Sequence, residues 1–511
     1  MPIKVKLQNK DGFIQNLPGL DVVNGHCDFP FIKDDKEYNE ECFKGKRGDW
    51  CATKKNFKTK KVQKWAYCDY SSALSNNKKP KTKKKMIIKK PKNNSINTNK
   101  KSNNSKEIPK NFLLPDSKYI KPKNYVLPNR KSFINWFDTT YGSYRVPKGN
   151  KFVKGKKFSY FNHQKIIRDY MSKDSPFRGL LLYHGLGVGK TCGSIAIAEG
   201  FRSDRKIIVM LNKSLRQNFK DNLKFCGFDY FRINQHWFFH KFGENDPMKS
   251  YAKTLGITLK RDLKGAWFID FIKEPNYEKL SKKEQEQVDN QINTMIDNKY
   301  SFINLDGLNE KKLIKMRDSK EFDNSILIVD EVHNLTNAMS KSKPGVRAKY
   351  LEEIIMSATN LKLVFLSGTP MINNLFETAK LFNLLRGPIK TYEIMFTQKA
   401  DKYNFNALEN VLSQNKIIDQ FFINKRNRNG SITRVPNGFI KTPNGFENNS
   451  EVNNYNDEEF LKYLKTILPR DINISIKNYT AFPNNEAEFM NLFYDNSKNQ
   501  IKNKELFKSR I

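Results

Sequence analysis

Residues 180–191 read Leu-Leu-Leu-Tyr-His-Gly-Leu-Gly-Val-Gly-Lys-Thr, an apolar run that ends in a glycine-rich turn. The next residues, 192–199, read Cys-Gly-Ser-Ile-Ala-Ile-Ala-Glu and suit a helix. The whole stretch therefore predicts a strand, a phosphate-binding loop and a helix. Because Gly187 and Gly189 lack a Cβ, the backbone between them can turn its N–H groups toward an anion at the start of the helix.

The loop predicts a binding site for a nucleoside triphosphate with magnesium. Lys190 is expected to neutralise the β- and γ-phosphates and Thr191 to hold the metal ion. The usual eight-residue pattern begins with glycine, whereas this loop begins with histidine, so a chance glycine-rich turn is the alternative interpretation and a second motif is needed. The nucleotide-binding residues expected here are His184, Gly185, Leu186, Gly187, Val188, Gly189, Lys190 and Thr191.

A second motif follows another buried strand. Residues 325–329 read Ser-Ile-Leu-Ile-Val, as expected for a central parallel strand, and Asp330-Glu331-Val332-His333 come next. Two adjacent acids at the end of a buried strand are costly unless a metal ion or ligand uses them. We therefore expect Asp330 to bind magnesium together with Thr191, and Glu331 to orient and deprotonate an attacking water molecule.

A third apolar run, residues 363–366, ends in Ser367-Gly368-Thr369-Pro370. In this order, the three stretches resemble motifs I, II and III of superfamily 2 helicases of the DExH type, in which the first loop position is free. The region 370–374 resembles that of Snf2-like translocases and of the helicase-like nucleoside triphosphatases and early transcription factors of poxviruses and giant viruses. The resemblance implies that coupling between nucleotide and nucleic acid runs from His333 to Ser367 and Thr369.

The resemblance assigns further roles on either side of the loop. Gln164 lies at the distance of the glutamine motif, where the amide reads adenine, although an ordinary polar helix residue is the alternative. Residues 207–211 form an apolar run, and the turn after it resembles motif Ia, which contacts the nucleic-acid backbone. The donors expected there are Lys213, Ser214 and Arg216.

Four of the six cysteines lie near the N-terminus, at Cys27, Cys42, Cys51 and Cys68, in a segment rich in aromatic residues. Their spacing contains no CxxC pair, which argues against a zinc site. The segment resembles a fibronectin type II module, and this implies disulfides Cys27–Cys51 and Cys42–Cys68 around an aromatic pocket for an unknown ligand. The alternative is a reduced, Trp-rich small core. Because disulfides do not persist in a reducing cytoplasm, a virion is one expected location. A cytoplasmic viral factory is the other expected location.

The net charge of +39 indicates a polyanionic partner, RNA or DNA. AT-rich codon usage is an alternative source of the lysines. The run Lys78-Lys79-Pro80-Lys81-Thr82-Lys83-Lys84-Lys85 predicts a disordered tether that binds nucleic acid, directs nuclear import or keeps the chain solvated. No apolar signal segment and no membrane span are predicted.

The expected fold class is α/β, with a RecA-like parallel sheet covered by helices on both faces. The expected domains are 22–70 for the cysteine module, 71–130 for the linker and 131–390 for the ATP-binding domain, with an insertion at about 228–300. Residues 391–511 are expected to be helical or irregular and to lead toward a second motor domain that is missing or only begun. No segment after Leu385 matches the arginine-finger motif, since Arg426 and Arg428 lie in an Asn-rich loop.

Two functions remain open on the sequence. The first is an ATP-dependent helicase or translocase acting in viral transcription, which hydrolyses ATP slowly unless a second polypeptide supplies the other motor domain. The second is a protein without motor activity, in which a nucleotide-gated domain tethers nucleic acid to a partner. DNA and RNA cannot be distinguished by these motifs.

Overall fold

The computed structural model describes residues 108–115, 118–145, 158–183, 185, 189–258, 264–341, 344–495, 497–498 and 500–511, preceded by the backbone of six short strands. The chain divides into two compact units, Met1–Ser102 and Asn103–Ile511. Within the described part, no helix combines the length and the apolar content needed to cross a bilayer.

The first unit consists of two small antiparallel sheets. One has the strand order β1 (Lys4–Lys6), β6 (Val62–Asp69), β5 (Gly48–Lys55) and β4 (Phe43–Gly45). The other pairs β2 (Phe31–Lys33) with β3 (Lys36–Tyr38). The side chains of the two predicted disulfides, Cys27–Cys51 and Cys42–Cys68, and residues 71–107 of the predicted linker 71–130 lie outside the described residues. The expectation of a disordered linker is wrong for its last part, where Tyr125 and Val126 are buried and Tyr125 forms a β-bridge with Phe446.

The second unit is built on a five-stranded parallel sheet. Its order is β11 (Tyr300–Asn304), β8 (Lys206–Leu211), β12 (Ser325–Val329), β13 (Lys362–Ser367) and β7 (Gly179–Tyr183). The central strands are continuous apolar runs because both faces of the sheet are covered. This confirms the predicted α/β class with a RecA-like parallel sheet.

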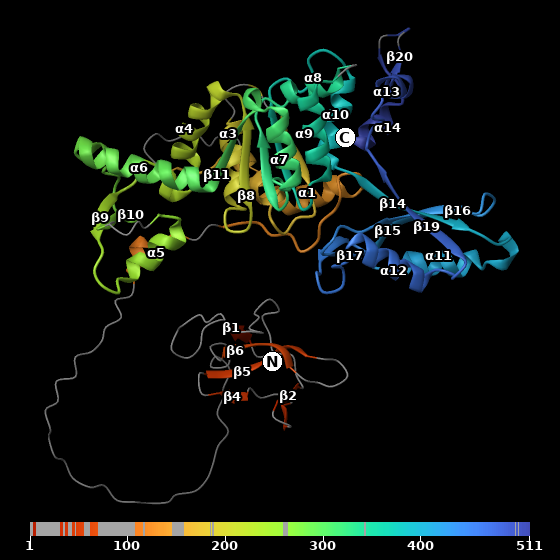
Figure 1. Ribbon diagram of the computed structural model, residues 1–511, viewed down its shortest axis with the longest axis horizontal. Helices are drawn as coiled ribbons and strands as arrows, with labels where there is room; N and C mark the ends of the chain where they lie inside the picture. Colours follow the sequence, from red (N-terminus) through yellow and green to blue (C-terminus); the bar gives the residue numbers. More distant parts are fainter. Residues whose placement is uncertain are drawn as a thin grey trace, which may run out of the picture. The chain divides into compact units, whose positions relative to one another are not determined.

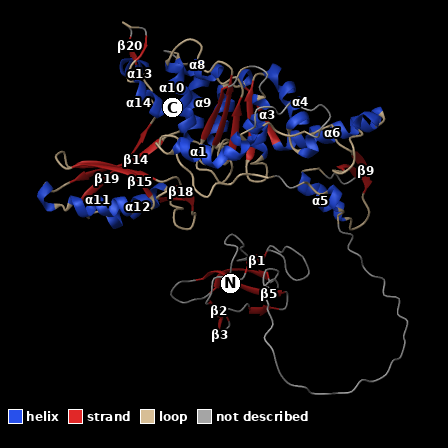
Figure 2. Ribbon diagram, turned by 180° about the vertical axis from the view of Figure 1, so that it is seen from behind, coloured by secondary structure: helices blue, strands red, loops and turns tan. Residues whose placement is uncertain are grey.

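Successive side chains of the buried strands enter two different cores, as the period of two in a strand requires. Ile207 and Val209 pack in the core that contains α3 (Lys190–Glu199), α4 (Arg216–Cys226) and α6 (Lys282–Lys299). Ile208 and Met210 pack in the other core, with four helices: α7 (Glu310–Asp318), α8 (His333–Ser340), α9 (Val346–Ser357) and α10 (Phe376–Arg386). Figures 1 and 2 show the sheet between these two groups, with α4 and α6 on one side and α9 and α10 on the other.

Two helices precede the sheet: α1 (Phe133–Tyr141) and α2 (Asn162–Tyr170). Between α4 and β11 the chain forms a hairpin of β9 (Trp237–Lys241) and β10 (Gly265–Ile269), with α5 (Pro247–Leu255) between the two strands. Helix α6 then brings the chain back to the sheet. These elements occupy the segment expected as an insertion.

The expectation of a helical or irregular segment after residue 390 is wrong for the first ninety residues or so. A four-stranded antiparallel sheet forms there, in the order β15 (Ile418–Asn424), β16 (Asn429–Arg434), β14 (Ile389–Phe396) and β19 (Ile472–Tyr479). Helices α11 (Phe405–Gln414) and α12 (Asp457–Ile467) cover one face, and a hairpin of β17 (Phe439–Thr442) and β18 (Gly445–Asn448) precedes α12. Both views show α11 and α12 beneath this sheet (Figures 1 and 2).

The last residues of the chain pack against α10, one of the helices that cover the parallel sheet. They form α13 (Glu486–Phe493), β20 (Tyr494–Asp495), β21 (Gln500–Ile501) and α14 (Lys504–Arg510). Phe482, Phe489 and Phe507 pack in one core with Phe376 and Ala379 of α10. This tail is therefore held by apolar contact with the helix that follows the third predicted motif.

Candidate nucleotide-binding site

The predicted motifs meet at one edge of the parallel sheet. Ser367, the last residue of β13, lies opposite Tyr183, the last residue of β7, and Phe365 lies opposite Val329 of β12. The segments that follow these three strands therefore emerge side by side at their carboxyl ends. In open α/β sheets this edge is where ligands bind.

The described part of the predicted phosphate loop consists of Gly185, Gly189, Lys190 and Thr191, whereas His184 and 186–188 lie outside the described residues. Gly189 has a φ of +80° and directly precedes α3, so Lys190 and Thr191 occupy the first turn of that helix. The Lys190 ammonium donates to the carbonyl of Gly185 over 3.1 Å, which spans the loop. The positive end of the helix dipole and the lysine charge act together on an anion bound here.

The buried side chain of Gln164 holds the end of this loop in place. Its side chain is 2% exposed. Its Oε1 accepts from the backbone N–H of Phe161 over 3.0 Å, and its Nε2 donates to the carbonyl of Gly189 over 3.0 Å. Both ends of the amide are thus used by the backbone, so in this structure Gln164 positions the end of the phosphate loop. A contact between Gln164 and adenine stays a prediction.

Asp330 and Glu331 follow β12 at the same edge. Burial raises the pKa of the Asp330 carboxyl, and the neighbouring charge of Glu331 raises it further, while Lys190 and His333 lower it. Because the positive charge of Lys190 lowers the pKa of Asp330, the loop lysine and this carboxylate interact electrostatically. Glu331 has a φ of +49°, a conformation that is uncommon for a residue with a side chain and that is concentrated at functional sites.

The predicted coupling residues form a chain of hydrogen bonds. Nδ1 of His333 lies 3.2 Å from a carboxylate oxygen of Glu331 and 3.0 Å from the hydroxyl of Ser367. The Ser367 hydroxyl accepts from the backbone N–H of Thr369 over 3.0 Å. A change in the charge or position of Glu331 can therefore reach the loop that follows β13.

The three predicted nucleic-acid donors lie where β8 ends. Lys213 and Ser214 are exposed, in a short turn of 3₁₀ helix. Arg216 begins α4, and its guanidinium lies 5.1 Å from the ring centre of Phe302 and 3.9 Å from Asp297. Lys213 and Ser214 are thus open to a partner, whereas Arg216 already has an aromatic and an acidic neighbour.

Sequence reasoning missed Glu377 of α10. This carboxylate is fully buried, and it accepts from the side chain of Asn337 and from the backbone N–H groups of Ile372 and Asn373 at distances of 2.8–3.2 Å. It fixes the loop that follows the third motif. No sequence signal marks it, because its partners are mostly backbone groups of that loop.

Sequence reasoning also missed a disulfide between Cys192 and Cys226. Cys192 lies two residues after Lys190, and Cys226 is the last residue of α4. The bond therefore joins the helix that begins at the phosphate loop to the helix that begins at the predicted nucleic-acid turn. Cys192 lies in the helix predicted at 192–199, but no sequence signal pairs it with Cys226.

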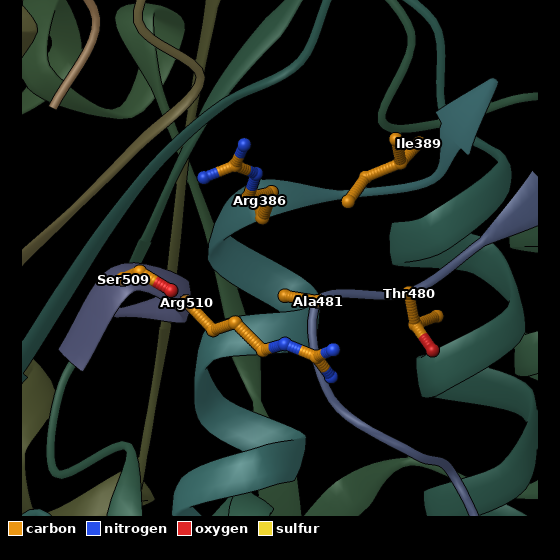
Figure 3. Close-up of a pocket in the computed structure, with 6 residues that line it drawn as sticks. All are labelled: Arg386, Ile389, Thr480, Ala481, Ser509 and Arg510. Carbon is orange, nitrogen blue, oxygen red and sulfur yellow. The ribbon is translucent and has the colours of Figure 1, made fainter. Parts of the chain in front are cut away.

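A small pocket of the second unit lies elsewhere. It is formed where α10 ends, where β14 begins and where α14 returns, and Arg386, Ala481 and Arg510 are among its lining residues. In Figure 3, Arg510 extends past Ala481, while the guanidinium of Arg386 points away from it. None of the residues predicted for nucleotide binding lines this pocket.

Comparison with known proteins gives two family matches. Residues 129–437, more than half of the chain, match the family described as SNF2-related domain. Residues 27–68 match the family described as Fibronectin type II domain.

Curated relatives are viral proteins. One is named "Putative ATP-dependent RNA helicase", from Acanthamoeba polyphaga mimivirus, and is 27% identical over 268 residues, which cover 51% of this chain and 39% of the relative. Another is named "Termination factor NPH-I homolog", from African swine fever virus, and is 28% identical over 231 residues, which cover 44% of this chain and 25% of the relative. The chain thus spans less than half the length of these relatives.

Among solved structures, the Sulfolobus solfataricus SWI2/SNF2 ATPase core in complex with dsDNA aligns with 52% of this chain and 38% of its own, at 13% identity and a TM-score of 0.22. A score this low supports no structural inference. The extent of the family match is sufficient by itself: the chain belongs to the SNF2-related family and carries a fibronectin type II domain near its N-terminus.

Proposed function

We propose that this chain provides the ATP-binding half of an ATP-dependent translocase that acts on nucleic acid. The observation that carries the proposal is that Asp330, which follows β12, and the loop with Lys190, which follows β7, lie at the same carboxyl edge of the sheet, with Glu331 3.2 Å from Nδ1 of His333. Membership of the SNF2-related family and the names of the viral relatives support it.

The residues at this edge suit magnesium bound to a nucleotide. Asp330 is a partly buried carboxylate whose charge is disfavoured by its surroundings and by Glu331, so a divalent cation would stabilise it. Carboxylate and hydroxyl oxygens are the ligands that magnesium prefers. Asp330 and Thr191 would hold the ion, which when bound neutralises charge on the β- and γ-phosphates.

The chain's own groups account for the remaining steps. Lys190 and the N-terminus of α3 bind the phosphates, and Gln164 keeps the end of the loop in its left-handed turn. Glu331 orients a water molecule and takes its proton as the water oxygen attacks the γ-phosphorus and the bond to the bridging oxygen breaks. The hydrogen bonds from Glu331 through His333 and Ser367 carry the change in the charge of Glu331 to Thr369. Lys213 and Ser214 would hold the nucleic-acid backbone.

Two variants test this assignment. Lys190→Ala should abolish binding of a fluorescent ATP analogue, whereas Glu331→Gln should bind ATP but hydrolyse it about 10²- to 10⁴-fold more slowly, the usual contribution of a general base. Lys283→Ala, which removes an exposed lysine from the start of α6, is the matched control. Nucleic-acid-stimulated phosphate release is the second measurement.

The same variants separate the motor from the tether. If the chain is a nucleotide-gated tether without motor activity, Lys190→Ala should leave its binding to nucleic acid largely intact. If Lys190→Ala binds and hydrolyses ATP as well as the unaltered chain does, this edge of the sheet is not the nucleotide site and the proposal fails. RNA and DNA strands of one sequence, compared as stimulants, would establish which nucleic acid is used.

A further inference from the structure

The region 389–479, here called the split-sheet module, has a topology that the nucleotide site does not explain. Apart from the β17–β18 hairpin, its elements follow the order β14, α11, β15, β16, α12 and β19, and the strand order β15-β16-β14-β19 places the first strand between the third and the fourth. This is the β-α-β-β-α-β, or ferredoxin-like, arrangement. Both helices pack on one face, where Tyr392, Ile394 and Phe396 of β14 are buried.

The opposite face of this sheet is open. Along β14 the side chains that alternate with the buried ones belong to Thr391, Glu393 and Met395, and Met395 is 60% exposed. On β15, Phe422 is also 60% exposed, and it lies in register with Ser431 of β16. This face therefore presents two large apolar side chains to solvent, on β14 and β15.

Apart from the paired Glu393 and Lys477, the residues between these apolar side chains carry uncharged hydrogen-bonding groups. Amides and hydroxyls from β15, β16 and β19 point to the open face, as the register requires. They belong to Gln420, Asn424, Asn429, Ser431, Thr433, Asn473 and Ser475. An apolar protein partner would favour a contiguous apolar patch, whereas isolated flat groups among amides and hydroxyls suit nucleobases, which stack and hydrogen-bond at the same time.

Tyr479 adds a second aromatic ring to this face. It is 46% exposed and lies in register with Ile389, yet its hydroxyl donates to Glu393, four residues further along β14. The side chain therefore reaches along the open face toward Glu393 and stays partly exposed. Lys477 pairs with the other oxygen of Glu393 at 2.6 Å, so the acid on this face is neutralised and does not repel phosphate.

One end of the open face is strongly basic. The turn between β15 and β16 contributes Arg426 and Arg428, and the backbone of Arg428 bonds to Phe396 at the end of β14. Lys399 and Arg470 adjoin the same end, after β14 and before β19. Among the described residues no acidic side chain pairs with any of these four cations, whereas Lys425 of the same turn pairs with Glu409 on α11.

We propose that the open face of the split-sheet module binds single-stranded nucleic acid at a site separate from the motor. Bases stack on Phe422 and Tyr479 and pack against Met395, amides and hydroxyls bond their edges, and phosphates lie toward Arg426 and Arg428. Four-stranded sheets with exposed aromatic residues bind single strands in this way, and stacking on each base is worth about 1–3 kcal/mol. This site does not depend on ATP.

The test uses the full chain in the absence of ATP. The probes are fluorescein-labelled 12-nucleotide RNA and DNA strands of the same mixed sequence. In anisotropy titrations, Phe422→Ala should weaken binding by at least about fivefold, the lower limit for one stacked base. Phe422→Tyr, which keeps the stacking ring, should bind like the unaltered chain. Val411→Ala, a change of a 46% exposed apolar residue on α11, is the matched control on the helical face.

Two further measurements locate the strand. A 4-thiouridine-labelled strand should cross-link to peptides from 416–434 or 472–479, and this cross-link should be lost in Phe422→Ala. Arg426→Ala combined with Arg428→Ala should reduce the salt dependence of binding by roughly one to one and a half units of log–log slope, as expected for two phosphate contacts.

The outcomes separate the site from the motor and from a protein interface. Lys190→Ala should leave this cross-link unchanged, so a failed nucleotide assignment would not affect it. Equal affinity of Phe422→Ala and Val411→Ala, with cross-links confined to 190–386, would overturn the proposal. So would concentration-dependent dimerisation that Phe422→Ala abolishes while strand binding stays the same, because the face would then be an interface between copies of the chain.

Discussion

At Gly189 the φ of +80° and the close approach of Gln164 both depend on the absence of a side chain. A Cβ built at this position would lie 2.6 Å from Nε2 of Gln164. The amide donates to the carbonyl of the same residue, so the glycine and the glutamine fit together as one support beneath the phosphate loop. Nearby Gly185 differs, since a Cβ there would meet no atom of the described residues within 4 Å.

We predict that Gly189→Ala weakens ATP binding by about tenfold or more. A left-handed alanine costs about 1–2 kcal/mol, and the clash displaces Gln164 as well, so the loop loses the conformation that directs its N–H groups at phosphate. Titration with a fluorescent ATP analogue measures the loss. Gly185→Ala should retain nearly normal affinity, and equal behaviour of the two variants would contradict this account of the loop.

At the level of elements, the Cys192–Cys226 bond joins α3 to α4 across 34 residues of sequence. These helices begin at the two places where nucleotide and nucleic acid are expected to bind, and both pack on the same face of the parallel sheet. A crosslink between them restricts the unfolded chain and keeps the two helices together in the folded one.

We predict that Cys192→Ser combined with Cys226→Ser lowers the free energy of unfolding of the second unit by about 2–4 kcal/mol, the range for a loop of this length. Denaturant titration under non-reducing conditions, compared with the unaltered chain, measures the loss. Thiol labelling of the native chain should leave both cysteines unmodified. Rapid labelling of either one in the folded protein would show that the bond does not form.

At the level of the whole molecule, the net charge of +39 favours association with any polyanion and makes that association sensitive to salt. The lysines are unevenly spread, since residues 78–92 contain nine of them. Such a segment can bind phosphates without reading sequence, in addition to whatever the motor and the split-sheet module contact.

We predict that deletion of residues 78–92 weakens nucleic-acid binding and lowers the slope of log affinity against log salt, since each phosphate contact adds about 0.7–0.9 to it. ATP binding should not change. Deletion of residues 93–107, an Asn- and Ser-rich stretch of equal length with three lysines, is the control. If both deletions give the same slope, the lysine block is solvating rather than binding.

The sequence by itself determined the parallel sheet and the edge at which the polar residues that follow its strands gather, for a physical reason. Buried parallel strands are continuous apolar runs, and the polar residues that follow them must share one edge, so the sequence pattern alone places Lys190, Asp330 and Ser367 together. The parallel strands could be predicted because the signals for them are local. Strand and turn both depend on residues within a few positions of each other.

Only the tertiary structure decided how residues 389–479 fold and which groups single side chains such as Gln164 and Glu377 contact. Strand β14 pairs with β19, about eighty residues later, and the polar open face weakens the alternation that would mark either strand in the sequence. The roles of Gln164 and Glu377 depend on backbone groups brought close by folding, and Cys192 meets Cys226 only because α3 and α4 pack together. Contacts between distant segments follow from the packing of whole elements, and no short stretch of sequence contains that information.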